Sequence, residues 1–172
     1  MTAYVALLRA VNVGGTGKLA MAELKRIGEQ LGFGSPRTFI ASGNLLFTSG
    51  KSEAQVQAAL EQALEKNTGK PVGVVVRTAK EMTAVAEANP FKDAPPNRVH
   101  ATFLADKLPQ DALDHARGRQ DERIALGKRE IYIDYGERGS GRSKLRIPAA
   151  AAGTARNMNS VAKLAEMAKE LT

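Results

Sequence analysis

The 172-residue sequence contains no cysteine and no tryptophan, and it has only two histidines. Without cysteine the chain forms no disulfide and offers neither a thiolate nucleophile nor a cysteine-based zinc site. The two histidines, His100 and His115, lie in different predicted elements, so we expect no metal site. Aromatic residues make up only 5% of the chain. This scarcity disfavours a platform of exposed rings on which single-stranded nucleic acid would stack.

Long apolar runs are also missing. No run approaches the roughly 18 residues that a membrane-spanning helix needs, and the N-terminus lacks the cationic stretch and cleavage site of a signal peptide. We therefore expect a cytoplasmic protein without a membrane partner. Charge, in contrast, is unbalanced, with a formal net charge of +7. Such a charge favours phosphorylated or polyanionic partners, although it is equally typical of proteins whose charge serves only solubility.

Hydrophobic periodicity in the first half of the chain predicts the element order β-α-β-β-α-β, followed by a further helix. Ser52 and Gln55 form a capping box at the start of one helix, and Thr78 and Glu81 cap another. The predicted elements are strand 4–11, helix 24–31, strands 37–41 and 45–48, a helix from residue 52, strand 72–76, and a helix from residue 78 that stops before Pro90.

The second half of the chain repeats part of this order. The predicted elements are strand 99–104, helix 110–117, strand 123–126, a turn at 127–128, strand 130–135, and a final helix with an apolar stripe from Met158 to Leu171. Both segments 41–43 and 125–127 begin with alanine and end with glycine, inside predicted hairpins at a constant offset. This correspondence suggests an internal duplication.

Together these elements predict an α+β fold of two ferredoxin-like (split βαβ) halves, with antiparallel or mixed sheets and a C-terminal helix. We expect an N-terminal subdomain over residues 1–88 and a C-terminal subdomain over residues 98–172. Segment 89–97, which contains three prolines, joins them as a linker. The two subdomains pack closely or form a single domain, because the length of the chain fits either arrangement.

A glycine-rich loop, Asn12-Val13-Gly14-Gly15-Thr16-Gly17-Lys18, lies between the first strand and the first helix, a setting in which backbone N–H groups bind phosphate. It is not a Walker A loop, because Asn12 replaces the first glycine and Leu19 replaces the hydroxyl that binds Mg²⁺. It is not a dinucleotide fingerprint either, because no acidic residue follows at the required distance and the helix leads into a hairpin. A generic anion-binding loop and a tight structural connection are the remaining alternatives.

Topology adds a second loop to the first. The first two strands of a split βαβ unit run parallel, so the loop after the first strand and the hairpin after the second emerge at the same edge of the sheet. Two polar loops that meet at one edge are a better candidate site than either loop alone. The predicted wall of this ligand site consists of Asn12, Gly14, Gly15, Ser42, Gly43 and Asn44.

Basic residues gather in segment 138–146, which is otherwise rich in glycine and serine. Cations on such a loop suit phosphate contacts, and a further arginine lies next to the predicted start of the final helix. The residues predicted to bind the anion are Arg142, Ser143, Lys144, Arg156 and Asn157. The alternatives are a solvated loop at 138–146 and helix caps at Thr154, Asn157 or Asn159.

No Ser-His-Asp order and no pairing of a base with a nucleophile is readable in the sequence. We therefore predict binding of a phosphorylated or anionic ligand, a small molecule or a nucleic acid, in a cleft lined by the glycine-rich and basic loops. No cofactor and no metal are predicted. A metal-independent enzyme that acts on a small polar substrate, and a protein-interaction module whose loops are purely structural, are the alternatives.

Several segments resemble a bacterial family called domain of unknown function 1697. They are residues 7–15, 21–24, 37–44, 89–91, 141–145 and 154–159, each weakly specific alone and quite specific together. The resemblance spans nearly the whole chain and implies an α+β fold of two ferredoxin-like halves, but it brings no established activity, substrate or cofactor. Phe39 and Met158 stand where the family usually has tyrosine and an aromatic residue. A ligand that stacks on residue 158 in relatives would therefore be bound differently here or not at all.

Overall fold

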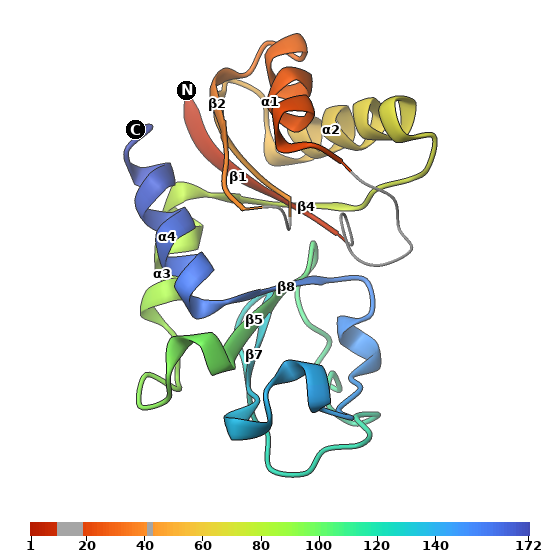
Figure 1. The fold of residues 1–172 in the computed structure, drawn as a ribbon, viewed down its shortest axis with the longest axis vertical. Helices are drawn as coiled ribbons and strands as arrows, with labels where there is room; N and C mark the ends of the chain where they lie inside the picture. The colour runs from red at the N-terminus through yellow and green to blue at the C-terminus, as the bar shows by residue number, and fades with distance from the viewer. Residues whose placement is uncertain (10–18, 41–42) are drawn as a thin grey trace. The chain divides into compact units, whose positions relative to one another are not determined.

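Two four-stranded antiparallel sheets form the framework of the chain in this computed structural model, which describes residues 1–9, 19–40 and 43–172 (Figure 1). The chain divides into two compact units. Unit 1 comprises residues 1–83 and 164–172, and unit 2 comprises residues 84–163. The sheets and the C-terminal helix confirm the predicted α+β fold with two halves.

Unit 1 has the predicted ferredoxin-like order. Its elements are β1 (Thr2–Leu8), α1 (Met21–Gln30), β2 (Gly34–Thr38), β3 (Asn44–Ser49), α2 (Glu53–Thr68), β4 (Val74–Thr78) and α3 (Ala79–Glu87), the last of which continues into unit 2. The strands lie in the order β2-β3-β1-β4. Because β1 and β2 are both antiparallel to β3, they run in the same direction, as predicted.

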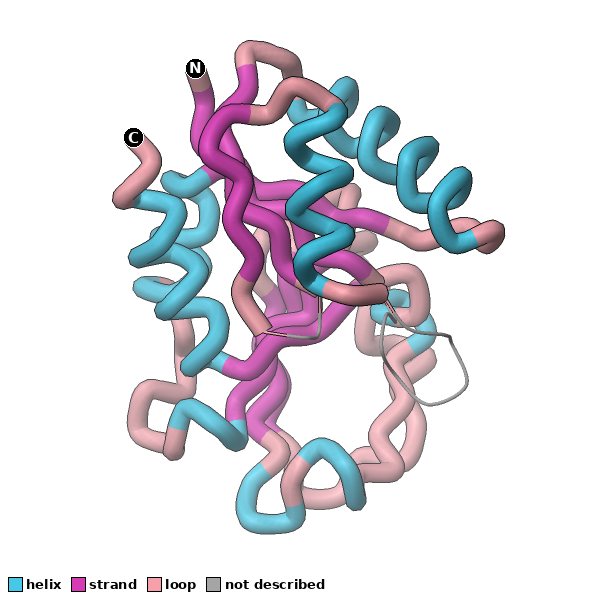
Figure 2. The backbone as a smooth tube through the Cα atoms, turned by 45° about the horizontal axis from the view of Figure 1, so that its top comes forward, coloured by secondary structure: helices cyan, strands magenta, loops and turns pink. Residues whose placement is uncertain are grey.

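Helices α1 and α2 cover one face of the first sheet (Figure 2). Alternation along the strands supplies the apolar floor, and Phe47 lies at its centre. The Phe47 ring stacks on Phe33 with 4.1 Å between centroids, and it contacts Tyr4 at 5.7 Å. The buried side chains of this core are Tyr4, Ala6, Leu8, Leu19, Leu24, Ile27, Phe33, Leu45, Phe47, Val56, Leu60, Leu64, Val74 and Val76.

Local signals place the helix ends of unit 1. Ser52 and Gln55 form the predicted capping box at the start of α2, and Gly69 ends that helix with φ of +78°. Thr78 and Glu81 exchange the equivalent pair of hydrogen bonds at the start of α3. These caps confirm the boundaries that the sequence predicts.

Unit 2 repeats the strand order of unit 1. Its strands are β5 (Val99–Phe103), β6 (Arg123–Leu126), β7 (Glu130–Asp134) and β8 (Thr154–Asn157), in the order β6-β7-β5-β8. Helix α4 (Met158–Lys169) follows β8 and continues into unit 1. The other helical turns are short 3₁₀ helices at Pro96–Arg98, Gly136–Arg138, Ser140–Arg142 and Pro148–Ala150.

The helix predicted at residues 110–117 is wrong. Turns occupy residues 110–115, with hydrogen bonds between residues three apart, such as Ala112 N–H to Pro109 O at 3.1 Å. An eight-residue helix has little stability of its own. Backbone hydrogen bonds to distant segments fix the chain on either side, at Leu108 to Lys128 and at Arg117 to Arg146. These long-range contacts override the weak local preference.

Strand β8 lies where the sequence predicts only the opening of the final helix. Thr154 belongs to this strand and pairs with Phe103, so it does not cap the helix. Asn157 does, because its Oδ1 accepts a hydrogen bond from Ser160 N–H at 2.9 Å. The four-residue strand is too short and too polar to show a strand period in the sequence.

The pairing registers of the two sheets correspond, although the hairpin match at 41–43 and 125–127, on which the predicted duplication rests, falls partly outside the described residues. Arg77 of β4 lies opposite Val5, and Arg156 of β8 lies opposite Ala101, in equivalent places of the two sheets. Both arginines are buried, and each is followed by the residue that caps the next helix. In each unit, the last strand of the sheet therefore carries a buried guanidinium, and the next residue caps the helix that follows.

Segment 89–97 packs within unit 2 through one arginine. Arg123 donates to Asp134 at 2.9 Å and to both carboxylate oxygens of Asp93 at 3.0 and 3.2 Å. Its guanidinium also lies 4.7 Å from the centre of the Phe91 ring. These contacts join segment 89–97 to β6 and β7. Within the described residues, no helix is long and apolar enough to cross a membrane.

Gly118 allows two segments of unit 2 to approach closely, and its replacement by alanine tests that contact. The new Cβ would lie 2.1 Å from the carbonyl oxygen of Lys144, at a φ of +73°. We expect Gly118→Ala to lower the free energy of unfolding by more than about 2 kcal/mol. Gly136→Ala is the matched control, because φ there is +64° and no described atom lies within 4 Å of the new Cβ. Equal losses in urea unfolding of the two variants would show that the contact with Lys144 is unimportant.

His100 makes stability depend on pH. It is half-buried in β5, with its ring edge-on to Tyr135 at 5.1 Å, and desolvation lowers its pKa below the ordinary 6.5. As pH falls below about 6.5, the unfolded chain binds a proton that the folded protein resists, so stability falls. We expect His100→Phe to flatten the dependence of unfolding free energy on pH between about pH 7 and 5. His115→Gln, at an exposed position, is the control for the loss of a histidine.

Candidate functional site

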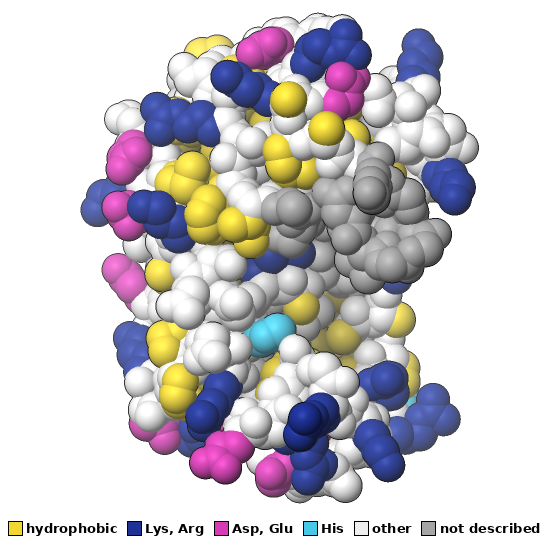
Figure 3. All heavy atoms as spheres, in the orientation of Figure 1, with side chains coloured by type: hydrophobic (Ala, Val, Ile, Leu, Met, Phe, Trp, Pro, Cys, Tyr) yellow, Lys and Arg dark blue, Asp and Glu magenta, His cyan; other side chains and the backbone are white. Residues whose placement is uncertain are grey.

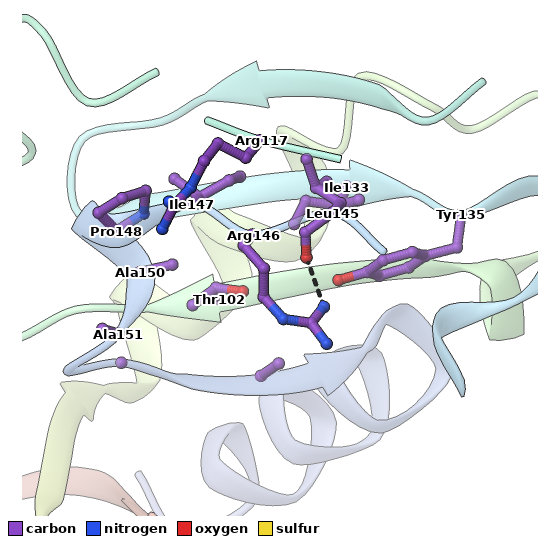
Figure 4. A pocket seen from close by; sticks show the side chains of 12 residues that line it. Thr102, Arg117, Ile133, Tyr135, Leu145, Arg146, Ile147, Pro148, Ala150 and Ala151 are labelled. Atoms are coloured by element: carbon purple, nitrogen blue, oxygen red, sulfur yellow. Dashed lines mark hydrogen bonds between the residues drawn. The ribbon is translucent and has the colours of Figure 1, made fainter. Parts of the chain in front are cut away.

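A cavity of about 480 Å³ lies on one face of the second sheet (Figure 4). Its floor consists of Thr102 from β5, Ile133 from β7 and Ala155 from β8. These residues share a face because Thr102 pairs with Ala155, and because Ile133 pairs with His100, two residues before Thr102. The volume lies within the range of sites that bind small molecules, roughly 300 to 1,000 Å³.

The same face in unit 1 is filled by helices. The register makes Thr102, Ile133 and Ala155 equivalent to Ala6, Phe47 and Val76, all of which lie in the core beneath α1 and α2. In unit 2, every residue of which is described, turns and 3₁₀ helices replace both of these helices. The cavity therefore occupies the space that helices fill in unit 1.

Segment 145–153 forms an apolar wall of the cavity. Leu145 and Ile147 pack with Ile131 and Ile133 of β7 in the core of unit 2. Gly153 permits the close return of this segment to β5, since a Cβ there would lie 2.7 Å from the carbonyl oxygen of Phe103. The lining residues of the wall are Leu145, Arg146, Ile147, Pro148, Ala150, Ala151 and Gly153.

Two arginines line the cavity from segments that meet in an isolated antiparallel bridge. Arg117 N–H donates to Arg146 O at 2.8 Å, and Arg146 N–H donates to Arg117 O at 2.7 Å. Like charges directly opposite one another destabilise a bridge of this kind. Within the described part of the chain, neither guanidinium is paired with a carboxylate. The two guanidinium groups therefore add positive charge to the lining of the cavity.

Tyr135 completes the polar lining. It follows β7 on the face of Ile131 and Ile133, and its hydroxyl is directed toward the Arg146 guanidinium (Figure 4). Burial raises the pKa of Tyr135, the Glu122 charge raises it further, and the Arg146 charge opposes them. The phenol is therefore a neutral hydrogen-bond donor at physiological pH.

Glu122 fixes the position of the segment that leads into the cavity wall. Its Oε1 accepts a hydrogen bond from Gln120 N–H at 2.6 Å, and its Oε2 accepts one from the Ser143 hydroxyl. Both hydrogen bonds lower the pKa of Glu122, and the bond from Ser143 has the larger effect. Ser143 in turn accepts a hydrogen bond from Leu145 N–H at 3.1 Å, so the buried carboxylate positions the chain just before Arg146.

The predicted anion-binding residues of unit 2 fall in different places. Arg142 and Lys144 are exposed beside the cavity wall and do not line the cavity. Arg156 lies on the opposite face of the sheet, where it donates to Thr154 Oγ1 at 2.7 Å and to Ala155 O at 2.9 Å. Burial lowers its pKa to about 10. Asn157 shares the face of the cavity floor and caps α4.

The predicted wall of glycine-rich loops lies only partly within the described residues. Asn12, Gly14, Gly15 and Ser42 lie outside them. Gly43 has φ of +91°, and its carbonyl oxygen accepts a hydrogen bond from Leu8 N–H at 2.8 Å. The buried Asn44 donates from Nδ2 to Phe39 O at 2.8 Å. The hydrogen bond from Leu8 places Gly43 beside the end of β1. The role of Gly43 and Asn44 in a ligand site stays a prediction.

Sequence reasoning missed Arg117, Tyr135 and Thr102 as cavity residues. Arg117 falls in the wrongly predicted helix, and the glycine after it was the available signal of a close backbone approach. Alternation from Ile131 through Ile133 would have placed Tyr135 on the same face. Arg146 belongs to the basic segment that the sequence singles out, and it is the member that lines the cavity.

Comparisons with known proteins agree with this fold. The family described as "Protein of unknown function (DUF1697)" matches residues 1–132. The conserved bacterial protein SP0830 from Streptococcus pneumoniae is 26% identical in sequence and has a similar structure, with a TM-score of 0.80 over 97% of this chain and 98% of that one. No curated protein matches the chain. The chain therefore belongs to the DUF1697 family, for which no function is known.

Proposed function

We propose that this protein binds a small anionic molecule with an apolar body in the cavity of unit 2. The observation that carries the proposal is the pair Arg117 and Arg146, which line one cavity and lack a carboxylate partner among the described residues. The floor and the wall are mostly apolar, which suits the body of the ligand. The proposal includes the cytoplasmic location expected from the sequence.

The surface charge supports the same choice of ligand. Segment 138–146 carries four basic residues and no acidic residue. Glu137 precedes it. Figure 3 shows Lys and Arg side chains spread over the surface of unit 2, with Asp and Glu side chains near its margin. A positive surface raises the local concentration of any anion. The volume of the cavity, about 480 Å³, suits a small molecule.

Removal of either cavity arginine should weaken binding of a probe that combines an apolar ring with an anion. We expect Arg117→Ala and Arg146→Ala to reduce the affinity for phenyl phosphate by about tenfold or more, because hydrogen bonds to charged groups contribute roughly 1.5 to 3 kcal/mol. Isothermal titration calorimetry measures the effect. Arg142→Ala and Lys144→Ala are matched controls, since both residues are exposed, as Arg117 and Arg146 are, but lie outside the cavity, and we expect changes below about twofold. Equal losses in all four variants would leave only a general charge effect.

A competition experiment separates a small ligand from nucleic acid. We expect a single-stranded DNA oligonucleotide at 0.15 M salt, roughly physiological ionic strength, to leave bound phenyl phosphate in place. Displacement of the probe, together with an oligonucleotide affinity that falls with several powers of the salt concentration, would instead identify a polyanion site.

A further inference from the structure

We propose that Thr102 selects the ligand of this cavity, because its hydroxyl forms a hydrogen bond with an oxygen on the apolar body of the ligand. The ligand is then an anion whose body carries a hydroxyl or carbonyl group. This inference rests on the proposed function and specifies the ligand of the same site. Three features of Thr102 support it: the hydroxyl without a partner, the fixed side chain, and the depth at which the residue lies.

The Thr102 hydroxyl has no hydrogen-bond partner among the described residues. Only 7% of the residue is exposed. Every fully enclosed side-chain nitrogen or oxygen in the described ranges has a partner, so the Thr102 oxygen is not fully enclosed and opens onto the cavity that the residue lines. A hydroxyl removed from water costs free energy unless it is hydrogen-bonded. The group therefore favours a ligand that brings a polar atom to it.

Contact with Gly153 fixes the direction of the Thr102 side chain. A Cβ on Gly153 would lie 2.9 Å from the Thr102 methyl carbon, so the methyl group is directed toward the glycine. The hydroxyl takes a different staggered position on the same Cβ, and the side chain of threonine has few allowed rotamers. Figure 4 shows the oxygen directed into the space among the lining residues. Its direction is therefore set before a ligand arrives.

Thr102 is the polar member of an apolar floor. The other two floor residues, Ile133 and Ala155, are apolar. The register makes Ala6 the equivalent of Thr102 in unit 1, where helices fill the space above the sheet. The hydroxyl is thus present in the unit whose sheet bears a cavity, and an apolar residue stands at the same place in the unit whose core is filled.

The charged groups of the cavity lie nearer to solvent than Thr102. Arg117 and Arg146 are exposed, whereas Thr102 is buried in the floor. An anionic group bound by the guanidinium groups stays toward the mouth of the cavity, and the body of the ligand extends to the floor. Thr102 then meets the body and not the anionic group. Because a hydroxyl both donates and accepts, it pairs equally with a hydroxyl or a carbonyl group.

Comparison of phenyl phosphate with meta- and para-hydroxyphenyl phosphate tests the inference. Phenyl phosphate tests the proposed function by itself, and the added hydroxyl tests Thr102. We expect at least one hydroxylated probe to bind the wild-type protein about fivefold more tightly than phenyl phosphate. In Thr102→Val, which keeps the shape of the side chain, that probe should lose about tenfold in affinity and phenyl phosphate less than about twofold. Calorimetric titration of the full chain measures all three affinities.

Thr154→Val is the matched control. Thr154 is also 7% exposed and lies in the neighbouring strand, but on the opposite face of the sheet, where its hydroxyl accepts a hydrogen bond from Arg156 at 2.7 Å. We expect Thr154→Val to lower the melting temperature and to leave the three affinities unchanged. Thr102→Val breaks no hydrogen bond within the described residues, so its melting temperature should equal or exceed that of the wild type.

Three results would contradict the inference. Equal losses for all three probes in Thr102→Val would show that the hydroxyl acts on the anionic group or on the fold, and a wild-type protein that prefers neither hydroxylated probe would show that it selects nothing. Either result overturns the role of Thr102 and leaves the proposed function standing. A wild-type protein that binds none of the three probes would overturn both.

Discussion

The two backbone hydrogen bonds between Arg117 and Arg146 are the interaction on which the cavity depends. They join segments from two different connections of unit 2, one between β5 and β6 and one between β7 and β8. The approach requires glycine at 118, because any side chain there would meet the carbonyl group of Lys144. By closing this bridge, the chain carries two long connections across the sheet without an α-helix in either of them.

The absence of those helices explains why a cavity exists in one unit and a filled core in the other. Both sheets have the same strand order, and equivalent strands carry equivalent buried arginines. In unit 1, α1 and α2 bury their apolar stripes on the sheet and fill the space above Phe47. In unit 2 the equivalent Ile133 is smaller, and irregular segments pass above it. Irregular backbone packs less completely than a helix stripe, and it also presents polar side chains such as Arg146 to the cavity.

Local sequence signals predicted most of unit 1 and less of unit 2. The capping pairs Ser52–Gln55 and Thr78–Glu81 involve residues three apart, so the sequence shows them directly. Residues 110–117 and β8 are governed by partners far along the chain, which no local pattern reveals. The candidate cavity could not be predicted from local patterns for the same reason. Its floor comes from three strands and its charged groups from two connections. Composition suggested the class of ligand that we propose, whereas the proposed location required the fold.

Attraction of a ligand and selection among ligands are separate properties of the proposed site. The net charge of +7 and exposed side chains such as Arg142 and Lys144 act through solvent, where salt screens a charge within about 8 Å at physiological ionic strength. Such charges attract every anion and distinguish none. Discrimination needs donors whose positions are fixed before the ligand arrives, since ordering them on binding would cost affinity. Three contacts fix polar groups of the cavity in this way. They are the hydrogen bond from Arg146 to Leu145, the hydrogen bond from Ser143 to Glu122, and the ring contact of Tyr135 with His100. In the proposed site, selectivity therefore resides in the few groups whose positions the fold fixes, whereas the other exposed cations raise the local concentration of every anion.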